Sequence, residues 1–171
     1  MSIRFVTVHT RGSWLPNRKE GSVKHGVGFV APNANLGAAY LANMNEPPVH
    51  FSAEEERVAL EAFLEKCRYK GWEPHGAGSE PSHVHGLLDA PPTVSDADLE
   101  YELKRGMSYR LNERFGKRKW WSEGGNVRLA RTTEKLAFYR DDYIPSHSGW
   151  IWHAEHGWRA PTKDQRPPRR T

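Results

Sequence analysis

The chain has 171 residues, a length that suits one domain with a modest hydrophobic core. Its 25 Lys and Arg residues outnumber its 21 Asp and Glu residues, so the net charge is +4, which permits a polyanionic partner but does not require one. Cys67 is the only cysteine, which excludes an intrachain disulfide and a zinc site built from cysteines. No stretch approaches the roughly 18 apolar residues of a membrane span, and the N-terminus lacks a signal-peptide core, so we expect a cytoplasmic protein.

The first third of the chain predicts one strand followed by a long loop. Residues 3–10 alternate in the β manner, with Phe5, Thr7 and His9 on one face and Val6 and Val8 on the other. Residues 11–50 are rich in Gly, Asn and Pro, which predicts an irregular region with a short strand at 27–30.

The next segment carries a complete set of helix signals. Ser52 and Glu55 form a capping-box pattern, an apolar stripe follows, and Gly71 supplies the C-terminal stop. Residues 72–77 and 83–88 then predict a β-hairpin around the turn at 79–82. A second helix begins after Ser95, because apolar residues recur every four positions from Leu99 to Leu111.

The last predicted elements are a short strand at 126–131 and a third helix. Thr132 or Thr133 caps this helix, which continues through Leu136, Tyr139 and Tyr143. The resulting order of strand, helix, two strands, helix, strand and helix predicts an α+β fold. We expect a ferredoxin-like antiparallel sheet with two helices on one face. Residues 1–150 form the expected domain, and residues 151–171 a tail rich in Trp, Arg and Pro.

Positive charge gathers in and after the second predicted helix, where aromatic residues accompany it. Such a segment suits phosphates and stacked bases, although a solvated helix face remains the alternative. The candidate nucleic-acid contacts are Lys104, Arg105, Arg110, Arg114, Lys117, Arg118 and Lys119.

The tripeptide His83-Val84-His85 is a candidate metal site. On a strand, residues two apart point the same way, so both imidazoles project from one face. Two neutral imidazoles can hold one divalent ion with positions left for substrate oxygens. A structural or surface pair is the alternative, since the chain has nine histidines.

Several weak motifs stand in a specific order over residues 3–147. They are Gly12-Ser13-Trp14-Leu15-Pro16 after the first strand, His83-Val84-His85, a Lys-containing helix, Trp121-Ser122-Glu123-Gly124-Gly125, and Tyr143-Ile144. In this order they resemble the single-tyrosine HUH transposases of bacterial insertion sequences and their REP-associated relatives.

The resemblance implies a function and a site. His83, His85 and His147 would hold Mg²⁺ or Mn²⁺, and Tyr143 would attack single-stranded DNA to leave a 5′-phosphotyrosine and a free 3′-OH. His147 stands where the family often has glutamine, and Pro145 disfavours regular helix just before it. The direction of the His147 side chain is therefore open, and His153 or His156 could replace it.

The implied partner is hairpin-forming single-stranded DNA, bound by a monomer or homodimer that associates with the nucleoid. Three alternatives stay open. Tyr139, one turn earlier, is the second candidate nucleophile, and Tyr143 would then be a packing residue. A catalytically inactive, domesticated nucleic-acid-binding protein would use the cations but not Tyr143. A zinc-dependent hydrolase would use His83 and His85 and tolerate substitution of Tyr143.

Overall fold

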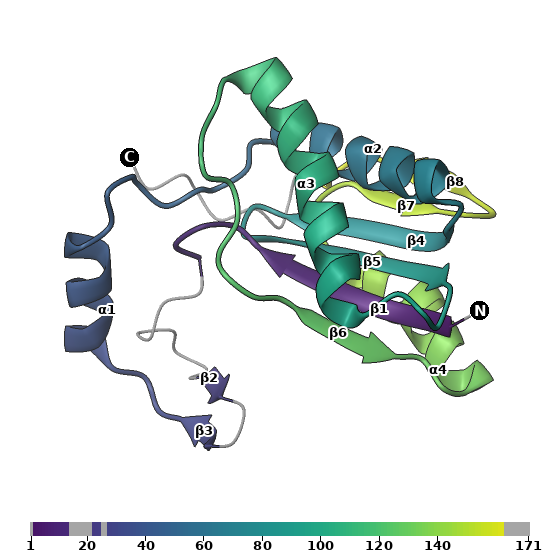
Figure 1. Cartoon of the computed structure of the whole chain (residues 1–171), viewed down its shortest axis with the longest axis horizontal. Coiled ribbons are helices and arrows are strands. Elements are labelled where there is room, and N and C mark those ends of the chain that lie inside the picture. The colour runs from purple at the N-terminus through teal and green to yellow at the C-terminus, as the bar shows by residue number, and fades with distance from the viewer. Residues whose placement is uncertain (1, 14–21, 25–26, 163–171) are drawn as a thin grey trace.

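A six-stranded antiparallel sheet forms the centre of the computed structural model, which describes residues 2–13, 22–24 and 27–162 (Figure 1). The strands lie in the order β6-β1-β5-β4-β7-β8. Their bounds are Ser2–His9 (β1), Glu73–Glu80 (β4), His83–Ala90 (β5), Asn126–Leu129 (β6), Ile151–His153 (β7) and Gly157–Arg159 (β8).

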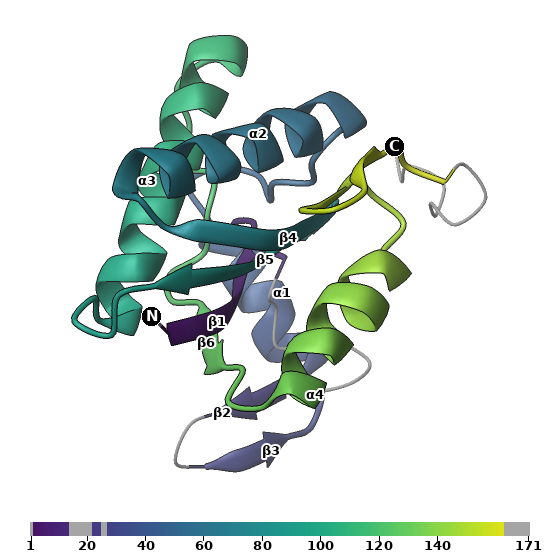
Figure 2. The same ribbon diagram turned by 90° about the vertical axis from the view of Figure 1, so that its right-hand side faces the viewer.

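Helices lie on both faces of the sheet. Helices α2 (Ala53–Lys70) and α3 (Asp96–Phe115) cover one face, whereas α4 (Thr133–Ala137) lies against the other (Figure 2). The chain passes through β1, α2, β4, β5, α3 and β6, and the central strands stand in the order β6-β1-β5-β4. This is the predicted ferredoxin-like α+β arrangement, extended by β7 and β8 at the β4 edge.

Helix ends form where the sequence predicts them. The Ser52 side chain accepts from the Glu55 N–H, the Glu55 carboxylate accepts from the Ser52 N–H, and Gly71 ends α2 with φ of 69°. Ser95 caps α3 by accepting from the Asp98 N–H. These bonds satisfy backbone donors that a helix terminus otherwise leaves unpaired.

The third helix changes its winding as it approaches Pro145. Thr132 caps α4, a π-helical turn η1 (Phe138–Tyr143) follows, and a 3-10 turn η2 (Ile144–Ser146) ends the run. The Ile144 N–H bonds the Tyr139 carbonyl five residues back. Pro145 has no N–H to continue the ladder, so the chain passes through a wider and then a tighter turn before it becomes extended at His147.

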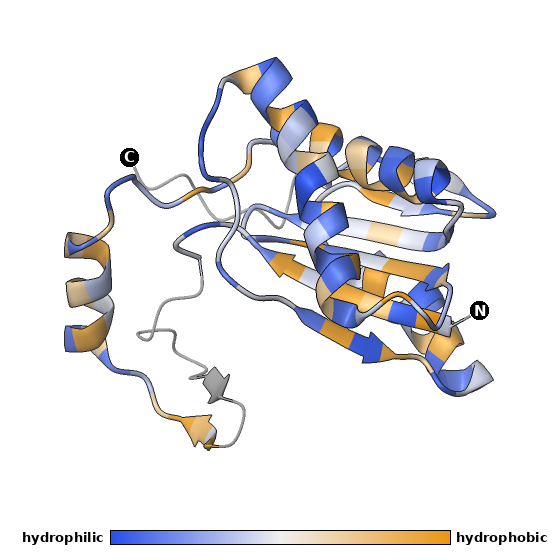
Figure 3. Cartoon of the chain, in the orientation of Figure 1, coloured by the Kyte–Doolittle hydropathy of each residue, from blue (hydrophilic) through white to orange (hydrophobic). Residues whose placement is uncertain are grey.

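Apolar residues, orange in Figure 3, recur along the strands and helices, and their buried side chains form two cores. The larger core joins Val6, Val8 and Val84 of the sheet to α2 and α3. The smaller core, on the opposite face, comprises Phe5, Leu87, Tyr139, Ile144 and Ile151. Alternation along the strands therefore separates a helix-bearing face from the face that carries His83 and His85.

Two expectations about irregular segments differ from the structure. The region 11–50 contains the expected short strand, β3 (Gly28–Val30), but also β2 (Ser22–Lys24) and helix α1 (Ala34–Ala42), which were not expected. Residues 151–159 are not a tail, because β7 pairs with β4 and β8 pairs with β7. The motif residues at 14–16 and the basic residues at 163–171 lie outside the described residues. Within the described chain, no helix is long and apolar enough to cross a membrane.

Candidate metal and nucleophile site

Strand register brings several polar side chains to one face of the sheet. In the β1–β5 pair, His9 lies opposite His83 and Thr7 lies opposite His85. Residues directly opposite on antiparallel strands project to the same side. Four imidazole or hydroxyl groups therefore gather near the C-terminal end of β1, on the face that η1 and η2 cover.

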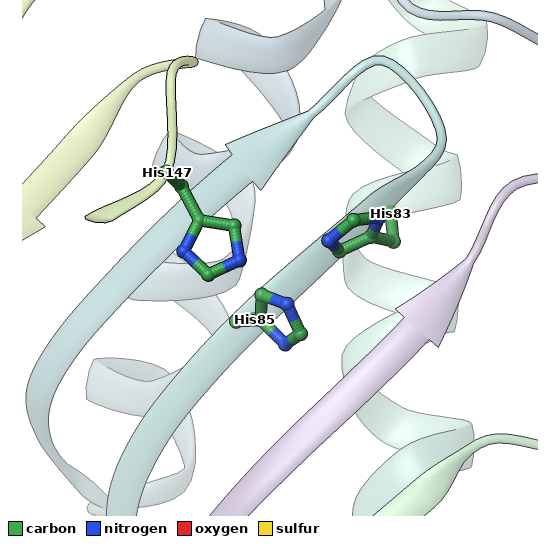
Figure 4. A group of neighbouring side chains, drawn as sticks. All are labelled: His83, His85 and His147. Atoms are coloured by element: carbon green, nitrogen blue, oxygen red, sulfur yellow. The ribbon is translucent and has the colours of Figure 1, made fainter. Parts of the chain in front are cut away.

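His147 joins His83 and His85 (Figure 4). One nitrogen from each of the three rings lies within 4.8 Å of the others. The ring centroid of His85 is 4.6 Å from that of His83 and 4.5 Å from that of His147. The turn at Pro145 thus directs His147 toward the histidine pair, and His153 and His156 are not part of this group.

The hydrogen bonds of His147 determine which of its nitrogens can bind a metal. Its Nδ1 lies 2.9 Å from the Tyr143 carbonyl oxygen and 3.1 Å from that of Ile144. A carbonyl can only accept, so Nδ1 carries the proton and Nε2 presents its lone pair. The same bond ties His147 to the backbone of Tyr143.

His85 is buried and oriented by Thr7. Its Nδ1 is 2.9 Å from the Thr7 hydroxyl. Burial, followed by the neighbouring His83, His147 and His9, lowers the pKa of His85 far below its ordinary value, so the ring stays neutral. Its buried Nε2 has no hydrogen-bond partner among the described residues. An unpaired buried nitrogen beside two other imidazoles fits a metal ligand.

The two candidate tyrosines occupy different environments. Tyr139 is 4% exposed and its ring stacks on Phe5 with centroids 4.1 Å apart. Tyr143 is 36% exposed, and its ring centroid is 5.3 Å from that of His85 and 5.1 Å from that of His147. Tyr139 is therefore a packing residue, whereas Tyr143 combines solvent access with proximity to the histidines.

Two glycines in β4 let η2 lie close to the sheet. A Cβ at Gly78 would be 3.1 Å from side-chain carbons of both Ile144 and Ile151, and one at Gly76 would be 3.4 Å from Ile144. Close approach of Ile144 to β4 helps to position Tyr143, the preceding residue, and His147, three residues later. This role cannot be predicted from the sequence, because a glycine in a strand indicates close approach without identifying the partner.

The predicted basic cluster lies mainly on the other face of the molecule. Arg110 pairs with Glu65 and Glu113, Arg114 pairs with Glu54, and Lys104 binds Glu100 together with the carbonyl oxygens of Ser122 and Gly124. Arg118 lies over the Trp120 ring, with its guanidinium carbon 4.9 Å from the centroid. Arg105 and Lys117 are exposed. Helix α3 does not bring these cations to the three histidines.

A cleft of about 710 Å³ lies beside the histidine group. It is lined by His9, whose ring centroid is 5.7 Å from that of His83. Three cations, Arg11, Lys119 and Arg128, line it together with the buried Trp121. Among the ion pairs found between described residues, none involves these three cations. Of the predicted basic residues, only Lys119 lies in this cleft.

The class of the site is thus three histidines that could hold a metal ion, beside an exposed tyrosine, on one face of a ferredoxin-like sheet. No family model matches the sequence, and neither does any curated protein. Among solved structures, a REP-associated tyrosine transposase bound to a REP hairpin is 17% identical with a TM-score of 0.47, over 84% of this chain and 64% of that one. A protein of Deinococcus radiodurans R1 assigned as a transposase is 14% identical with a TM-score of 0.45, over 84% of this chain and 88% of its own.

Proposed function

We propose that the chain is a metal-dependent, transposase-like enzyme that cuts single-stranded DNA and becomes joined to it through Tyr143. The observation that supports this most is the exposed Tyr143 ring beside three converging imidazoles. A nucleophile must reach a substrate, and Tyr143 is more accessible than Tyr139.

His83, His85 and His147 would hold the ion. Imidazole donors favour first-row transition ions, whereas Mg²⁺ prefers oxygen, so Mn²⁺ fits this set better than Mg²⁺. When bound, the ion supplies Lewis-acid neutralisation of the phosphate oxygens. The Thr7 hydroxyl and the two carbonyls that bond His147 hold the rings in place for it.

The rest of the reaction is carried out by Tyr143 and by the residues that hold its ring in place. Its hydroxyl oxygen forms a bond to phosphorus while the bond from phosphorus to the 3′ oxygen breaks. The tyrosine loses a proton and the departing 3′ oxygen gains one, so the products are a 5′-phosphotyrosine and a free 3′-OH. The Tyr143 ring packs edge-on against Phe5, with centroids 5.5 Å apart, and lies 5.9 Å from Phe138. These contacts limit its motion and favour one attack direction.

The DNA strand would enter through the cleft that His9 lines. Arg11, Lys119 and Arg128 can bind phosphates without first giving up a carboxylate partner, unlike Arg110 and Arg114 of α3. The buried Trp121 is also among the residues that line this cleft. This path would bring a strand to His83 and onward to Tyr143. A hairpin-forming substrate follows from the motif resemblance.

The test is a covalent adduct. Full-length protein incubated with Mn²⁺ and a hairpin-bearing single-stranded oligonucleotide should give a protein–DNA species that survives denaturing electrophoresis. Tyr143→Phe should bind the oligonucleotide but give no adduct, and Tyr139→Phe is the matched control that should retain it. Binding without any adduct in the wild-type protein would support the inactive nucleic-acid-binding alternative. Cleavage that needs zinc and survives Tyr143→Phe would support the hydrolase.

A further inference from the structure

A second group of metal-capable side chains lies in the β7–β8 hairpin. His153, Glu155 and His156 each offer one ligand atom, and these atoms lie within 4.8 Å of one another. The group shares no residue with His83, His85 and His147. His153 ends β7, the other two residues belong to the following turn, and Gly157 begins β8 with φ of 71°. The reversal of the chain at this turn brings the two histidines together.

His153 is oriented as metal-binding histidines commonly are. Its Nε2 is 3.3 Å from a carboxylate oxygen of Asp141, and its Nδ1 is 3.1 Å from the Glu155 backbone nitrogen. Because that N–H donates to Nδ1, the ring proton resides on Nε2 and is donated to Asp141. The Nδ1 lone pair therefore faces the turn that carries Glu155 and His156, and an ion bound there would replace the hydrogen bond from the Glu155 N–H. A carboxylate behind an imidazole fixes the ring and raises its basicity as a ligand.

The other groups can close around an ion with small movements. The rings of His153 and His156 are nearly parallel, with centroids 4.5 Å apart and an interplanar angle of 15°. Glu155 and His156 are exposed, so their side chains are free to rotate at little cost. Metal–nitrogen distances of about 2.0–2.1 Å require the ligand atoms to approach by roughly an ångström.

We propose that His153, Glu155 and His156 form a second metal site, selective for Zn²⁺ and similar first-row transition ions. Two imidazoles and one carboxylate match the ligand preferences of that class. Asp141 holds His153 from behind and is itself held by two bonds from Arg140. Asp141 lies in η1 two residues before Tyr143. An ion at this site links the β7–β8 hairpin to the turn that carries Tyr143. The site does not depend on DNA cleavage by Tyr143.

The test counts zinc by calorimetric titration of the chelator-stripped, full-length protein. The wild type should bind two equivalents. His156→Ala should bind one, because His156 is exposed and its loss leaves the fold intact, as circular dichroism would verify. The double variant His83→Ala/His85→Ala should also bind one. His50→Ala removes an exposed histidine outside both groups and should still bind two.

A second variant tests the role of Asp141. Asp141→Asn should keep the second equivalent but weaken its binding about 10- to 100-fold, the usual effect of losing a carboxylate behind a ligating histidine. The proposal is overturned if His156→Ala binds as many equivalents as the wild type and as tightly, or if His83→Ala/His85→Ala binds none. A single equivalent in the wild type that is lost in His156→Ala and kept in His83→Ala/His85→Ala would instead contradict the site of His83, His85 and His147.

Discussion

Thr7 orients the buried His85 ring from the neighbouring strand, although it does not line the group of three nitrogens itself. Thr7→Val keeps the shape of the side chain and removes its hydroxyl, so His85 Nδ1 loses its partner at 2.9 Å. We expect Mn²⁺ affinity to fall about 10- to 100-fold, since the ring is no longer fixed. The free energy of unfolding should fall by about 1–3 kcal/mol because a buried polar atom is left unpaired.

Titrations of the metal and chemical denaturation of the same samples would measure both effects. Thr10→Val is a useful comparison, because Thr10 is also buried and its hydroxyl bonds the Val49 carbonyl rather than a histidine. It should lose stability without a matching loss of Mn²⁺ affinity. Equal metal affinity in Thr7→Val and the wild type would show that Thr7 does not orient His85.

Among the elements, the contact between η2 and β4 controls where Tyr143 and His147 lie. Gly78→Ala places a Cβ 3.1 Å from side-chain carbons of Ile144 and Ile151, so these side chains must give way by a few tenths of an ångström. Such overpacking costs about 1–3 kcal/mol, and the shift should also weaken Mn²⁺ binding through His147. Gly76→Ala is the matched control, because its added Cβ meets Ile144 at an ordinary 3.4 Å. Denaturation midpoints and metal affinities that change equally in both variants would contradict this role for Gly78.

DNA binding in the cleft and DNA binding on α3 predict opposite effects of charge-removing substitutions on the salt dependence of affinity. Each phosphate contact on single-stranded DNA adds roughly 0.7 to the slope of log affinity against log salt. Arg11→Gln/Arg128→Gln should therefore flatten the slope by about 1.4. Arg110→Gln/Arg114→Gln removes the same charge from the paired cations of α3 and should leave the slope nearly unchanged. The reverse result would move the DNA-binding face to α3, as the charge pattern of the sequence alone suggests.

At the scale of the whole molecule, patterns local in sequence predicted the fold well. The capping box at Ser52 and the four-residue repeat from Leu99 to Leu111 each specify a helix through neighbours in the chain. The β7–β8 hairpin was missed, because its pairing with β4 depends on residues some 75 positions apart. The sequence shows the charges of Arg110 and Arg114, but it does not show that carboxylates of α2 pair with them.

In the candidate site, too, some features could be predicted from local sequence and others depend on distant contacts. The spacing of His83 and His85 determines that they share a face, and the motif resemblance supplied His147. The direction of His147 depends on how the chain winds around Pro145 and on the close approach of Ile144 to Gly78. These are tertiary contacts, and no periodicity in the sequence contains them.

Burial of the Cys67 thiol predicts that the folded protein becomes less stable at alkaline pH. Burial raises the pKa of Cys67 to about 12 from an ordinary 9.0, so the unfolded chain loses this proton at lower pH than the folded protein. The stabilisation is therefore complete below pH 9 and is lost progressively from pH 9 to 12. The free energy of unfolding should fall by up to about 1.4 kcal/mol per pH unit. Cys67→Ala should lose this component of the slope in urea denaturation series, whereas an identical slope would contradict the assignment.

Identification of the residue joined to DNA tests whether Tyr143 is the nucleophile. The adduct formed with a hairpin oligonucleotide and Mn²⁺ would be digested with protease and nuclease, and its peptides sequenced by mass spectrometry. The account predicts a nucleotide attached through its 5′ phosphate to Tyr143, and an unmodified Tyr139, whose ring is buried against Phe5. A nucleotide on Tyr139, or on any residue other than Tyr143, would contradict the account.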